Sequence, residues 1–324
     1  MKQIQFTTYG GPEVLQVIET AQPKATGRQV LIEAKAIGVN YADTARREGK
    51  YVVPTPLPFV PGTEVAGIVC DVGEEVTSVS LGQRVVALIE EGGYADYVLV
   101  DERSVIALPN GFDFYEAVAL PVQGLSAYHI LKTMGRLEEG ETVLIHAAAG
   151  GVGTIAVQLA RIFGAGTIIA TASTDEKRAL ARQLGAHVAV DYTKEGWKDE
   201  VLAATDGKGV DVALEMAGGD VFQQTLQCLA PFGRLVIYGV ASGQLTKMTP
   251  SLLMGKNLSV IGFFLPQIMR KRALYQQSLQ EMLHYVQTGR VQLTIGGVYP
   301  LEQAADVHRL LQSRQTHGKL ILVP

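Results

Sequence analysis

The sequence is poor in cysteine, with only Cys70 and Cys228 among 324 residues. Two thiols cannot build the disulfide framework that stabilises small secreted domains. Each cysteine lies in an apolar run, so we expect two buried free thiols in a reducing compartment. The six histidines show no spacing typical of metal ligands, so the sequence predicts no metal site.

Excess positive charge is also missing. Lysine and arginine number 28 against 32 acidic residues, which gives a formal net charge of −4. The one dense basic cluster, residues 270–272, is interpreted as a solvated helix start. The composition therefore provides no general attraction to nucleic acid or to anionic lipid, and we expect neither as a partner.

Nothing in the sequence is typical of a membrane span. Residues 142–160 carry no charged side chain, and a membrane helix needs about 20 apolar residues. The stretch contains three glycines, a histidine and a glutamine, however, and strand–turn–helix describes it better. Residues 1–6 alternate like a strand and show no signal peptide. We expect a cytoplasmic protein.

The length of the chain predicts two domains. Up to residue 122, short alternating segments punctuated by glycine and proline indicate a compact, barrel-like β domain. From residue 123, strands and helices alternate, which predicts a doubly wound parallel sheet in an α/β chain. The segments after 266 are expected to return to the first domain, so the predicted domains are 1–122 with 266–324, and 123–265.

The expected elements follow from these patterns. Strands are expected at 14–19, 29–39, 64–72, 84–89 and 94–100, then at 142–146, 167–171, 188–190, 210–215, 233–238 and 258–263. The C-terminal part is expected to form a helix at 272–288, a strand at 291–298, a helix at 301–312 and a strand at 318–322.

The most informative stretch, residues 143–161, runs from an apolar strand through a glycine turn into an apolar helix. Gly150 is expected to adopt backbone angles that a side chain would resist. Gly151 and Gly153 would leave the surface bare for a pyrophosphate, and the helix from Val152 would direct its free N–H groups at that anion. The spacing departs from G-x-G-x-x-G because Ala148 stands at the first glycine position. The pattern predicts a dinucleotide site; a glycine turn at any buried strand–helix junction is the alternative.

The residues about 20 positions later bear on which dinucleotide is bound. NAD enzymes usually carry an acid there, whereas this chain has Ser173. Lys177 and Arg178 begin the next helix, near enough to meet a 2′-phosphate that a carboxylate would repel. The sequence therefore favours NADP(H). The alternative is that both cations are solvated helix residues beside Asp175 and Glu176.

Five motifs along the chain carry a family resemblance. In chain order they are G-V-N-Y-A-D (38–43), P-F-V-P-G-T-E-V-A-G (58–67), L-P-V-Q-G-L-S-A-Y (120–128), A-A-A-G-G-V-G (147–153) and H-G-K (317–319). With these motifs the sequence resembles the medium-chain dehydrogenase/reductase superfamily, and within it the zinc-free NADPH:quinone oxidoreductases related to zeta-crystallin. The resemblance implies a GroES-like β-barrel-type catalytic domain, a Rossmann cofactor domain, NADPH as hydride donor and usually a homodimer, for which strand 258–263 is a candidate contact.

One departure from the larger superfamily bears on the reaction. The zinc alcohol dehydrogenases that this chain resembles carry Cys where Asn40 stands and His where Thr63 stands. Without a Lewis acid an alkoxide is not stabilised, so oxidation of a simple alcohol is not expected. A quinone accepts hydride readily, and hydrogen bonds can hold the developing oxyanion. We therefore expect an NADPH-dependent quinone oxidoreductase. The alternatives are an enal or enone reductase, and a non-catalytic nucleotide- or RNA-binding crystallin-like protein.

The resemblance places Asn40, Asp43 and Tyr51 at the nicotinamide and the acceptor. Asn40 would donate an amide hydrogen bond to the substrate oxygen. Tyr51 would do the same, form an aromatic wall, or simply pack its loop. Asp43 would orient the cofactor or polar neighbours, or serve as a plain helix cap. No obligate general base is assigned, because hydride transfer to a quinone can take its proton from water.

The resemblance also implies a set of cofactor contacts. Ser126 would lie at the nicotinamide ribose, or cap a helix. Phe263 and Phe264 would offer backbone groups to the carboxamide, or pack in the core. Arg314 and Lys319 would reach the cofactor phosphate, or stay solvated. The full set is Ser126, Ala149, Gly150, Gly151, Val152, Gly153, Ser173, Lys177, Arg178, Tyr192, Gly239, Val240, Phe263, Phe264, Arg314 and Lys319.

Overall fold

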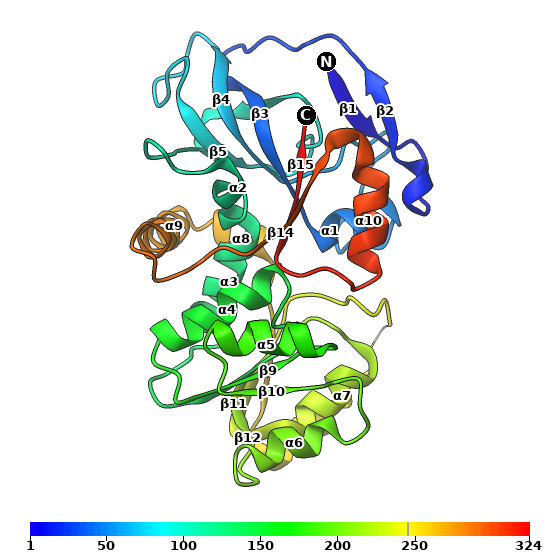
Figure 1. The fold of residues 1–324 in the computed structure, drawn as a ribbon, viewed down its shortest axis with the longest axis vertical. Helices are drawn as coiled ribbons and strands as arrows, with labels where there is room; N and C mark the ends of the chain where they lie inside the picture. The colour runs from blue at the N-terminus through cyan, green and yellow to red at the C-terminus, as the bar shows by residue number, and fades with distance from the viewer. Residues whose placement is uncertain (245) are drawn as a thin grey trace. The chain divides into compact units, whose positions relative to one another are not determined.

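The computed structural model describes residues 1–244 and 246–324. They pack into two units, one formed by residues 1–122 and 295–324, the other by residues 123–294. The first unit joins the N-terminal part, in blue and cyan, to the C-terminal segment in red (Figure 1). No helix among these described residues is both long and apolar enough to cross a membrane.

The first unit is built on a seven-stranded sheet in the order β14-β15-β3-β4-β5-β7, with β6 paired to β3 off this path. β3 is central, since it pairs with β4, β6 and β15, and its side chains are therefore mostly buried. The elements are β1 (Lys2–Gln5), η1 (Pro12–Val14), β2 (Gln16–Glu19), β3 (Gln29–Val39), α1 (Tyr41–Arg47), β4 (Glu64–Val72), β5 (Arg84–Leu88), β6 (Tyr97–Asp101), η2 (Glu102–Ser104), β7 (Val105–Ala107), α2 (Phe114–Ala117), β14 (Ile295–Pro300), η6 (Leu301–Gln303), α10 (Ala304–Gln312) and β15 (Lys319–Val323).

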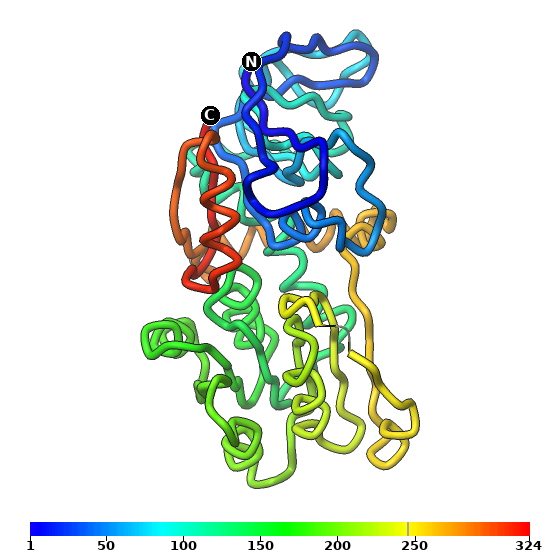
Figure 2. The backbone as a smooth tube through the Cα atoms, turned by 90° about the vertical axis from the view of Figure 1, so that its right-hand side faces the viewer, coloured from blue at the N-terminus to red at the C-terminus, as the bar shows by residue number. Residues whose placement is uncertain are grey.

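The C-terminal segment completes this unit in two ways. β15 pairs antiparallel with β3 in the register Leu320 to Val39, so its first residue lies beside the residue that follows β3. α10 packs against α1 and η1, and Figure 2 shows its red coil beside the blue N-terminal trace. Residues almost 300 positions apart in the chain are thereby brought to one end of the sheet.

The second unit is a six-stranded parallel sheet in the order β10-β9-β8-β11-β12-β13. Counted within the unit this order is 3-2-1-4-5-6, the doubly wound arrangement, so the predicted fold class is confirmed. The elements that follow the junction helix η3 (Leu120–Gly124) are α3 (Leu125–His129), η4 (Ile130–Met134), β8 (Thr142–Ile145), α4 (Gly151–Ile162), β9 (Thr167–Thr171), α5 (Asp175–Gln183), β10 (Val188–Val190), α6 (Trp197–Ala203), β11 (Val210–Glu215), α7 (Gly219–Cys228), β12 (Leu229–Ile237), η5 (Pro250–Lys256), β13 (Ser259–Gly262), α8 (Leu265–Met269) and α9 (Arg272–Gln287).

The return to the first unit comes later than expected, at residue 295 instead of 266. The helix α9 packs on α3 in the second unit, where Tyr128 Oη donates to Glu281 Oε2 at 2.8 Å. The segment after α9 is also held there, because Gln158 exchanges two hydrogen bonds of 2.9 and 2.8 Å with the backbone of Gln292. These side-chain contacts correct the predicted domain boundary.

Two strands, β6 and β14, begin three or four residues later than the alternation suggested. β6 starts at Tyr97 instead of 94, because the preceding loop turns to meet Pro61, whose carbonyl accepts from Tyr94 N at 2.9 Å. β14 starts at Ile295 instead of 291, because Gln158 holds the segment before it. Helical segments between 114 and 134, which include α2 and α3, were not among the expected elements.

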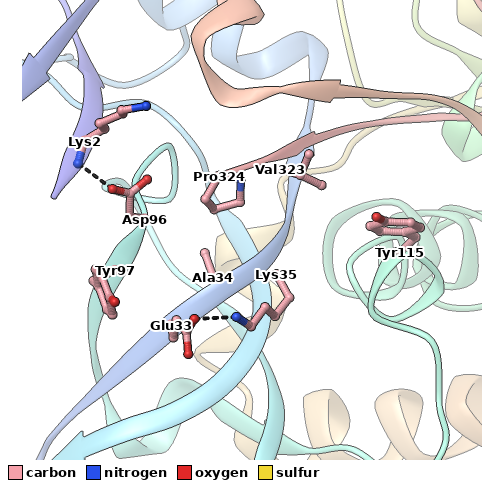
Figure 3. A pocket seen from close by; sticks show the side chains of 9 residues that line it. All are labelled: Lys2, Glu33, Ala34, Lys35, Asp96, Tyr97, Tyr115, Val323 and Pro324. Carbon is pink, nitrogen blue, oxygen red and sulfur yellow. Dashed lines mark hydrogen bonds and ion pairs between the residues drawn. The ribbon is translucent and has the colours of Figure 1, made fainter.

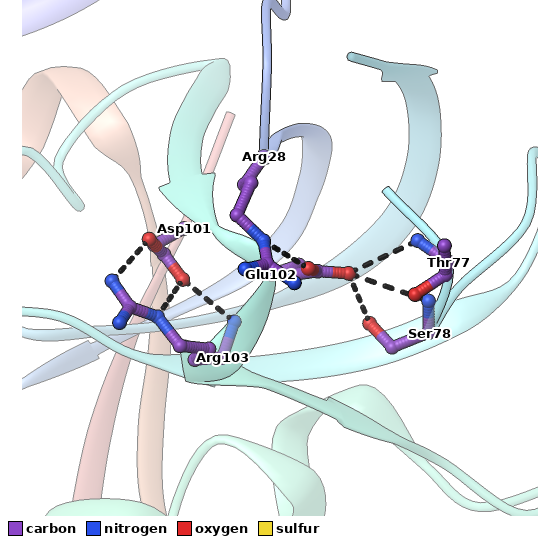
Figure 4. A network of polar contacts seen from close by, with 6 residues as sticks. All are labelled: Arg28, Thr77, Ser78, Asp101, Glu102 and Arg103. Atoms are coloured by element: carbon purple, nitrogen blue, oxygen red, sulfur yellow. Dashed lines mark hydrogen bonds and ion pairs between the residues drawn. The ribbon is translucent and has the colours of Figure 1, made fainter. Parts of the chain in front are cut away.

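A buried carboxylate joins three segments of the first unit (Figure 4). Glu102 Oε1 accepts from Arg28 Nε at 2.8 Å, while Oε2 accepts from Thr77 N at 3.1 Å and from Ser78 Oγ at 2.9 Å. The bond from Thr77 N–H, followed by that from Arg28, lowers the pKa of Glu102 to about 2. The carboxylate thus ties the start of β3 and the loop after β4 to the end of β6.

This carboxylate predicts an acid-dependent loss of stability. Its folded pKa of about 2 lies below the unfolded value of about 4.3, so its contribution is complete above pH 4.3 and disappears as the pH falls toward 2. We expect Glu102→Gln to lower Tm at pH 7, with the difference from the wild type shrinking between pH 5 and pH 2.5. Thermal unfolding followed by circular dichroism measures this. Glu91→Gln, at an exposed position, is the matched control, and equal Tm values for Glu102→Gln and the wild type at pH 7 would contradict the assignment.

Candidate functional site

The strand β3 ends directly before Asn40, which precedes the first turn of α1. The backbone N–H of Asn40 donates to Asp43 Oδ2 at 2.8 Å. The carboxylate of Asp43 therefore closes the start of the helix, where negative charge is favoured by the helix dipole. Both residues are buried, and the structure brings these two predicted residues together.

The Asn40 side chain has a defined orientation. Lys319 Nζ donates to Asn40 Oδ1 at 3.0 Å, and Asn40 Nδ2 donates to Glu64 Oε1 at 2.7 Å. An ammonium only donates, so the amide atom that faces it must be the oxygen. The second N–H of the amide has Thr63 Oγ1 as a neighbour at 3.5 Å, too far for a strong bond. One amide N–H of Asn40 thus remains available to a stronger acceptor.

The ion pair between Lys319 and Glu64 fixes this orientation. Lys319 Nζ contacts Glu64 Oε1 directly, and the two side chains are 1% and 0% exposed. The other carboxylate oxygen accepts from Val122 N at 2.9 Å. Gly38 makes room for the pair, because a Cβ there would lie 2.4 Å from Glu64 Oε1. Lys319 was predicted at the cofactor phosphate; the structure instead engages its ammonium inside the first unit.

Asp43 is fully buried and asymmetrically bonded. Oδ2 accepts from Asn40 N and from Tyr94 Oη, the latter at 3.1 Å, while Oδ1 is buried without a hydrogen-bond partner. Burial raises the pKa of Asp43 to about 6, although the Asn40 N–H bond and the charge of Lys319 oppose that rise. The carboxyl is therefore ionised at neutral pH but close to its titration range.

Tyr51, the third predicted catalytic residue, lies on the proline-rich loop with different neighbours. The guanidinium of Arg46 stands over its ring at 4.4 Å and over the ring of Phe59 at 5.3 Å. Such cation–π contacts fix aromatic side chains at partly exposed positions. Burial raises the pKa of the Tyr51 phenol, so it stays protonated at neutral pH and can donate a hydrogen bond.

The glycine turn of the second unit differs in detail from the prediction. Gly150 has φ −77° and ψ 174°, angles open to any residue, and the positive φ of 48° belongs to Ala147. Gly153 is needed for close packing, since a Cβ there would lie 2.2 Å from Ala147 O. Gly151 is covered by the amide of Gln123, which a Cβ would approach to 2.2 Å. The predicted bare surface is therefore wrong for Gly151 and Gly153, whereas α4 does begin at this turn.

The two predicted 2′-phosphate cations have different environments. Arg178 is already paired, with Nη1 at 3.0 Å from Asp191 Oδ2 and Nη2 at 2.5 Å from Asp175 Oδ1. Arg178 Nη1 also donates to Ala172 O at 3.1 Å and so holds the loop that follows β9. Lys177 begins α5 beside that loop, and burial lowers the pKa of its ammonium. Arg178 is thus better described as a support, and the phosphate-binding role of Lys177 stays a prediction.

The remaining predicted cofactor residues fall into two groups. The residues of the first group follow the carboxyl ends of the parallel strands, where ligands of this fold bind. They are Ala149 and Val152 after β8, Ser173 after β9, Tyr192 after β10, Gly239 and Val240 after β12, and Phe263 and Phe264 after β13. Ser126 is buried within α3, and Arg314 belongs to the first unit. No contact with a cofactor is established for any of them, and their roles stay predictions.

Four residues of these networks were missed at the level of the sequence. Glu64 lies within the motif 58–67. The signal that the sequence offered was an acidic residue close after a proline–glycine pair. Gln123 lies within the motif 120–128, and its Oε1 is buried without a partner beside α4. Tyr94 and His308 carry no local signal, because their bonds to Asp43 and Arg47 span the whole first unit.

Metal ligands are not grouped in the described residues: no three His, Cys, Asp or Glu side chains lie where they could hold an ion. Cys228 is buried, as predicted, but Cys70 is exposed, because it is on the outward face at the end of β4.

A cavity of about 460 Å³ lies elsewhere in the first unit (Figure 3). The residues that line this cavity carry charges of both signs, and none of them is a predicted site residue. The lining residues are Lys2, Glu33, Ala34, Lys35, Asp96, Tyr97, Tyr115, Val323 and Pro324.

Comparison with known proteins covers the whole chain. Residues 26–110 match the family described as alcohol dehydrogenase GroES-like domain, and residues 151–286 match the family described as zinc-binding dehydrogenase. The chain is 38% identical to a quinone oxidoreductase of Pseudomonas aeruginosa, over 100% of this chain and 99% of that protein. It is 34% identical to quinone oxidoreductase 1 of Escherichia coli, over 99% of each.

Solved structures agree with this assignment. The Escherichia coli quinone oxidoreductase complexed with NADPH superimposes with a TM-score of 0.95 at 34% identity, covering 100% of both chains. A mycobacterial protein complexed with NADPH gives a TM-score of 0.94 at 33% identity, also over 100% of both chains. Sequence and fold similarity over the full length, together with the two-unit architecture, establish that this chain belongs to the quinone oxidoreductase family of medium-chain dehydrogenases/reductases.

Proposed function

We propose that this protein transfers a hydride from NADPH to a quinone or a similarly electron-poor acceptor, without a metal. The observation that carries the proposal is the Asn40 amide, whose oxygen is fixed by Lys319 while one N–H lacks a strong partner. Relatives over the full length of the chain are named quinone oxidoreductases, and two similar structures are complexed with NADPH.

The residues of the second unit fit NADPH. The free N–H groups at the start of α4 suit the pyrophosphate, and the unpartnered Oε1 of Gln123 beside them suits a hydroxyl donor. Lys177 follows a loop with no acidic residue at the ribose position, which suits a 2′-phosphate. When bound, the dihydronicotinamide supplies the hydride, and the protein's part is to bind and orient it.

On the acceptor side, the Asn40 amide polarises the carbonyl group of the acceptor. As an acceptor carbonyl gains electrons its oxygen becomes negative, and a preoriented N–H stabilises that charge. The Glu64–Lys319 pair keeps the amide from turning its oxygen toward the acceptor, where it would repel the charge. The quinol needs one further proton, which water can supply. Tyr51 Oη, protonated at neutral pH, is a second donor.

The proposed function is tested by NADPH oxidation with 9,10-phenanthrenequinone and, separately, with a short enal. We expect turnover with the quinone well above that with the enal, unchanged by a metal chelator. Faster reduction of the enal would identify a carbon–carbon double-bond reductase. NADPH binding without turnover of either acceptor would indicate a non-catalytic protein, and loss of activity in chelator would overturn the metal-free mechanism.

The proposed preference for NADPH over NADH predicts that the positive charge of Lys177 lowers KM for NADPH. A charge-assisted hydrogen bond is worth about 1.5–3 kcal/mol, so we expect Lys177→Glu to raise KM for NADPH about 10- to 100-fold and KM for NADH much less. Steady-state kinetics with each cofactor measures this. The control is Lys208→Glu, which makes the same charge change in the exposed turn before β11. This turn lies at the amino end of its strand, whereas the proposed cofactor residues follow the carboxyl ends. Equal effects of Lys177→Glu on both cofactors would contradict the role.

We also propose a cytoplasmic homodimer. β13 is the edge strand of the sheet, so among residues 1–244 and 246–324 one side of its backbone pairs with no strand. Leu252 and Met254, on the neighbouring η5, are 59% and 76% exposed and are candidate contacts for a second copy of the chain. Light scattering after size exclusion is expected to give twice the chain mass, and a charged substitution at Met254 is expected to lower it.

A further inference from the structure

Four buried polar side chains form a single chain of hydrogen bonds in the first unit. Arg47 Nη1 lies 3.2 Å from His308 Nδ1, and His308 Nε2 lies 3.1 Å from Tyr94 Oη. Tyr94 Oη lies 3.1 Å from Asp43 Oδ2. All four residues are 0% exposed, and they come from α1, α10 and the loop before β6. The C-terminal helix is thus linked to the residue that caps α1.

The direction of each bond follows from the donors present. A guanidinium only donates, so His308 Nδ1 must accept and the ring proton must be on Nε2. Burial, with the charge of Arg47, lowers the pKa of His308 to about 3, so the ring is neutral. His308 Nε2–H therefore donates to the oxygen of Tyr94, and the Tyr94 O–H donates to Asp43 Oδ2. Every donor points from Arg47 toward Asp43.

Such a chain does not conduct protons. A relay needs a group at each end that can take up or release a proton, and arginine keeps its proton at physiological pH. Arg47 is also fixed, because its Nε donates to Gly10 O at 3.0 Å and its Nη2 donates to Gln312 Oε1 at 3.0 Å and to Glu48 Oε1 at 2.9 Å. The chain instead connects two buried, opposite charges through two neutral rings, which stack edge to face with centroids 5.8 Å apart.

This chain of hydrogen bonds reaches Asn40 through Asp43. Asp43 Oδ2, which receives the Tyr94 proton, is the same oxygen that accepts the Asn40 backbone N–H. We propose that His308 is a positioning residue for the acceptor site: by fixing the Tyr94 O–H on Asp43, it keeps that buried carboxylate ionised and Asn40 in place. This inference rests on the proposed function, in which the Asn40 amide meets the acceptor.

Loss of the Tyr94 donor changes the charge balance at Asp43. The other groups that act on this carboxyl are the Asn40 N–H and the charge of Lys319 on β15, which favour ionisation, and Glu64 on β4, which opposes it. Without the Tyr94 bond, burial dominates further and Asp43 takes up a proton at neutral pH. A protonated Asp43 is a poorer acceptor for the Asn40 N–H, so the amide loses its anchor.

The test compares Tyr94→Phe and His308→Leu with the wild type. In the wild type we expect the acid limb of the kcat profile near the Asp43 pKa of about 6. In Tyr94→Phe we expect this limb to move up by about one to two pH units, the size of a lost hydrogen bond to a charge. In His308→Leu, where Tyr94 keeps its hydroxyl but loses the group that orients it, we expect a smaller shift in the same direction. At pH 7, kcat then falls about two- to tenfold and recovers at pH 9, while KM for NADPH stays within twofold.

Two controls and a fallback keep the outcome decisive. His308→Gln restores an N–H near Nε2 and is expected to recover most of the wild-type profile. His129→Leu removes a buried, hydrogen-bonded histidine from the second unit and is expected to lower Tm without moving the acid limb. Should His308→Leu fail to fold, Tyr94→Phe, which removes one oxygen and keeps the ring, carries the test alone.

A second readout separates this inference from the proposed function. Carboxyl ¹³C NMR of aspartate-labelled protein follows the titration of Asp43 without any acceptor. Unchanged titration in Tyr94→Phe, or a shifted titration with an unchanged kcat profile, would overturn the inference. Absence of quinone turnover in the wild type, with the titration shift present, would overturn the proposed function and with it the positioning role.

Discussion

Replacing Lys319 by methionine is expected to cause the largest loss of stability of any single substitution considered for this protein. The change leaves the Glu64 carboxyl 0% exposed and without its cation. Removing one partner of a buried ion pair costs about 3–5 kcal/mol, because the remaining charge is uncompensated. Native proteins are stable by about 5–15 kcal/mol, so the first unit should unfold at a markedly lower temperature or denaturant concentration. Urea denaturation followed by circular dichroism measures the change.

Two further variants test the reason for that loss. Lys35→Met breaks the Lys35–Glu33 pair, whose side chains are 37% and 38% exposed, and should change stability by only about 0–1 kcal/mol. Lys319→Met combined with Glu64→Gln removes both charges and should recover most of the lost stability. The double variant still lacks the charged donor that orients Asn40, so its kcat should stay low. A single Lys319→Met variant as stable as the wild type would refute the account.

The architecture could be predicted because it depends on local patterns. β3 and β4 carry the alternation of residues 29–39 and 64–72, and the strand–turn–helix of β8 and α4 is visible in residues 143–161. The doubly wound order then follows from general rules of chain connection. These features need no knowledge of which side chains meet.

The contacts within the site could not be predicted in the same way. Lys319 was expected at a phosphate, yet the β15–β3 register places it beside Asn40, and no local pattern fixes that register. Arg178 was expected to be available, but Asp191, 13 positions later, already neutralises it. In both cases a polar side chain that leaves water must find a partner, and the partner comes from a distant segment.

Asn40→Ala is expected to cause the largest loss of activity. Removing one preoriented donor from an oxyanion site typically lowers kcat about 10²- to 10³-fold. The residues proposed to bind the pyrophosphate and the 2′-phosphate of NADPH lie in the other unit, so the dissociation constant for NADPH, measured by fluorescence quenching, should be unchanged. Glu64 keeps its bond to Lys319, so the stability loss should be no more than about 1–3 kcal/mol.

The control for Asn40→Ala is Asn110→Ala, which removes an exposed amide from a turn of the same unit and should leave kcat unchanged. Asn40→Asp separates charge from shape, because it keeps the size of the side chain but brings a second carboxyl to Glu64 and to the acceptor oxygen. We expect it to be at least as inactive as Asn40→Ala. If Asn40→Ala kept kcat within threefold of the wild type, the developing negative charge would have to be stabilised elsewhere, and Tyr51 would be the next group to test.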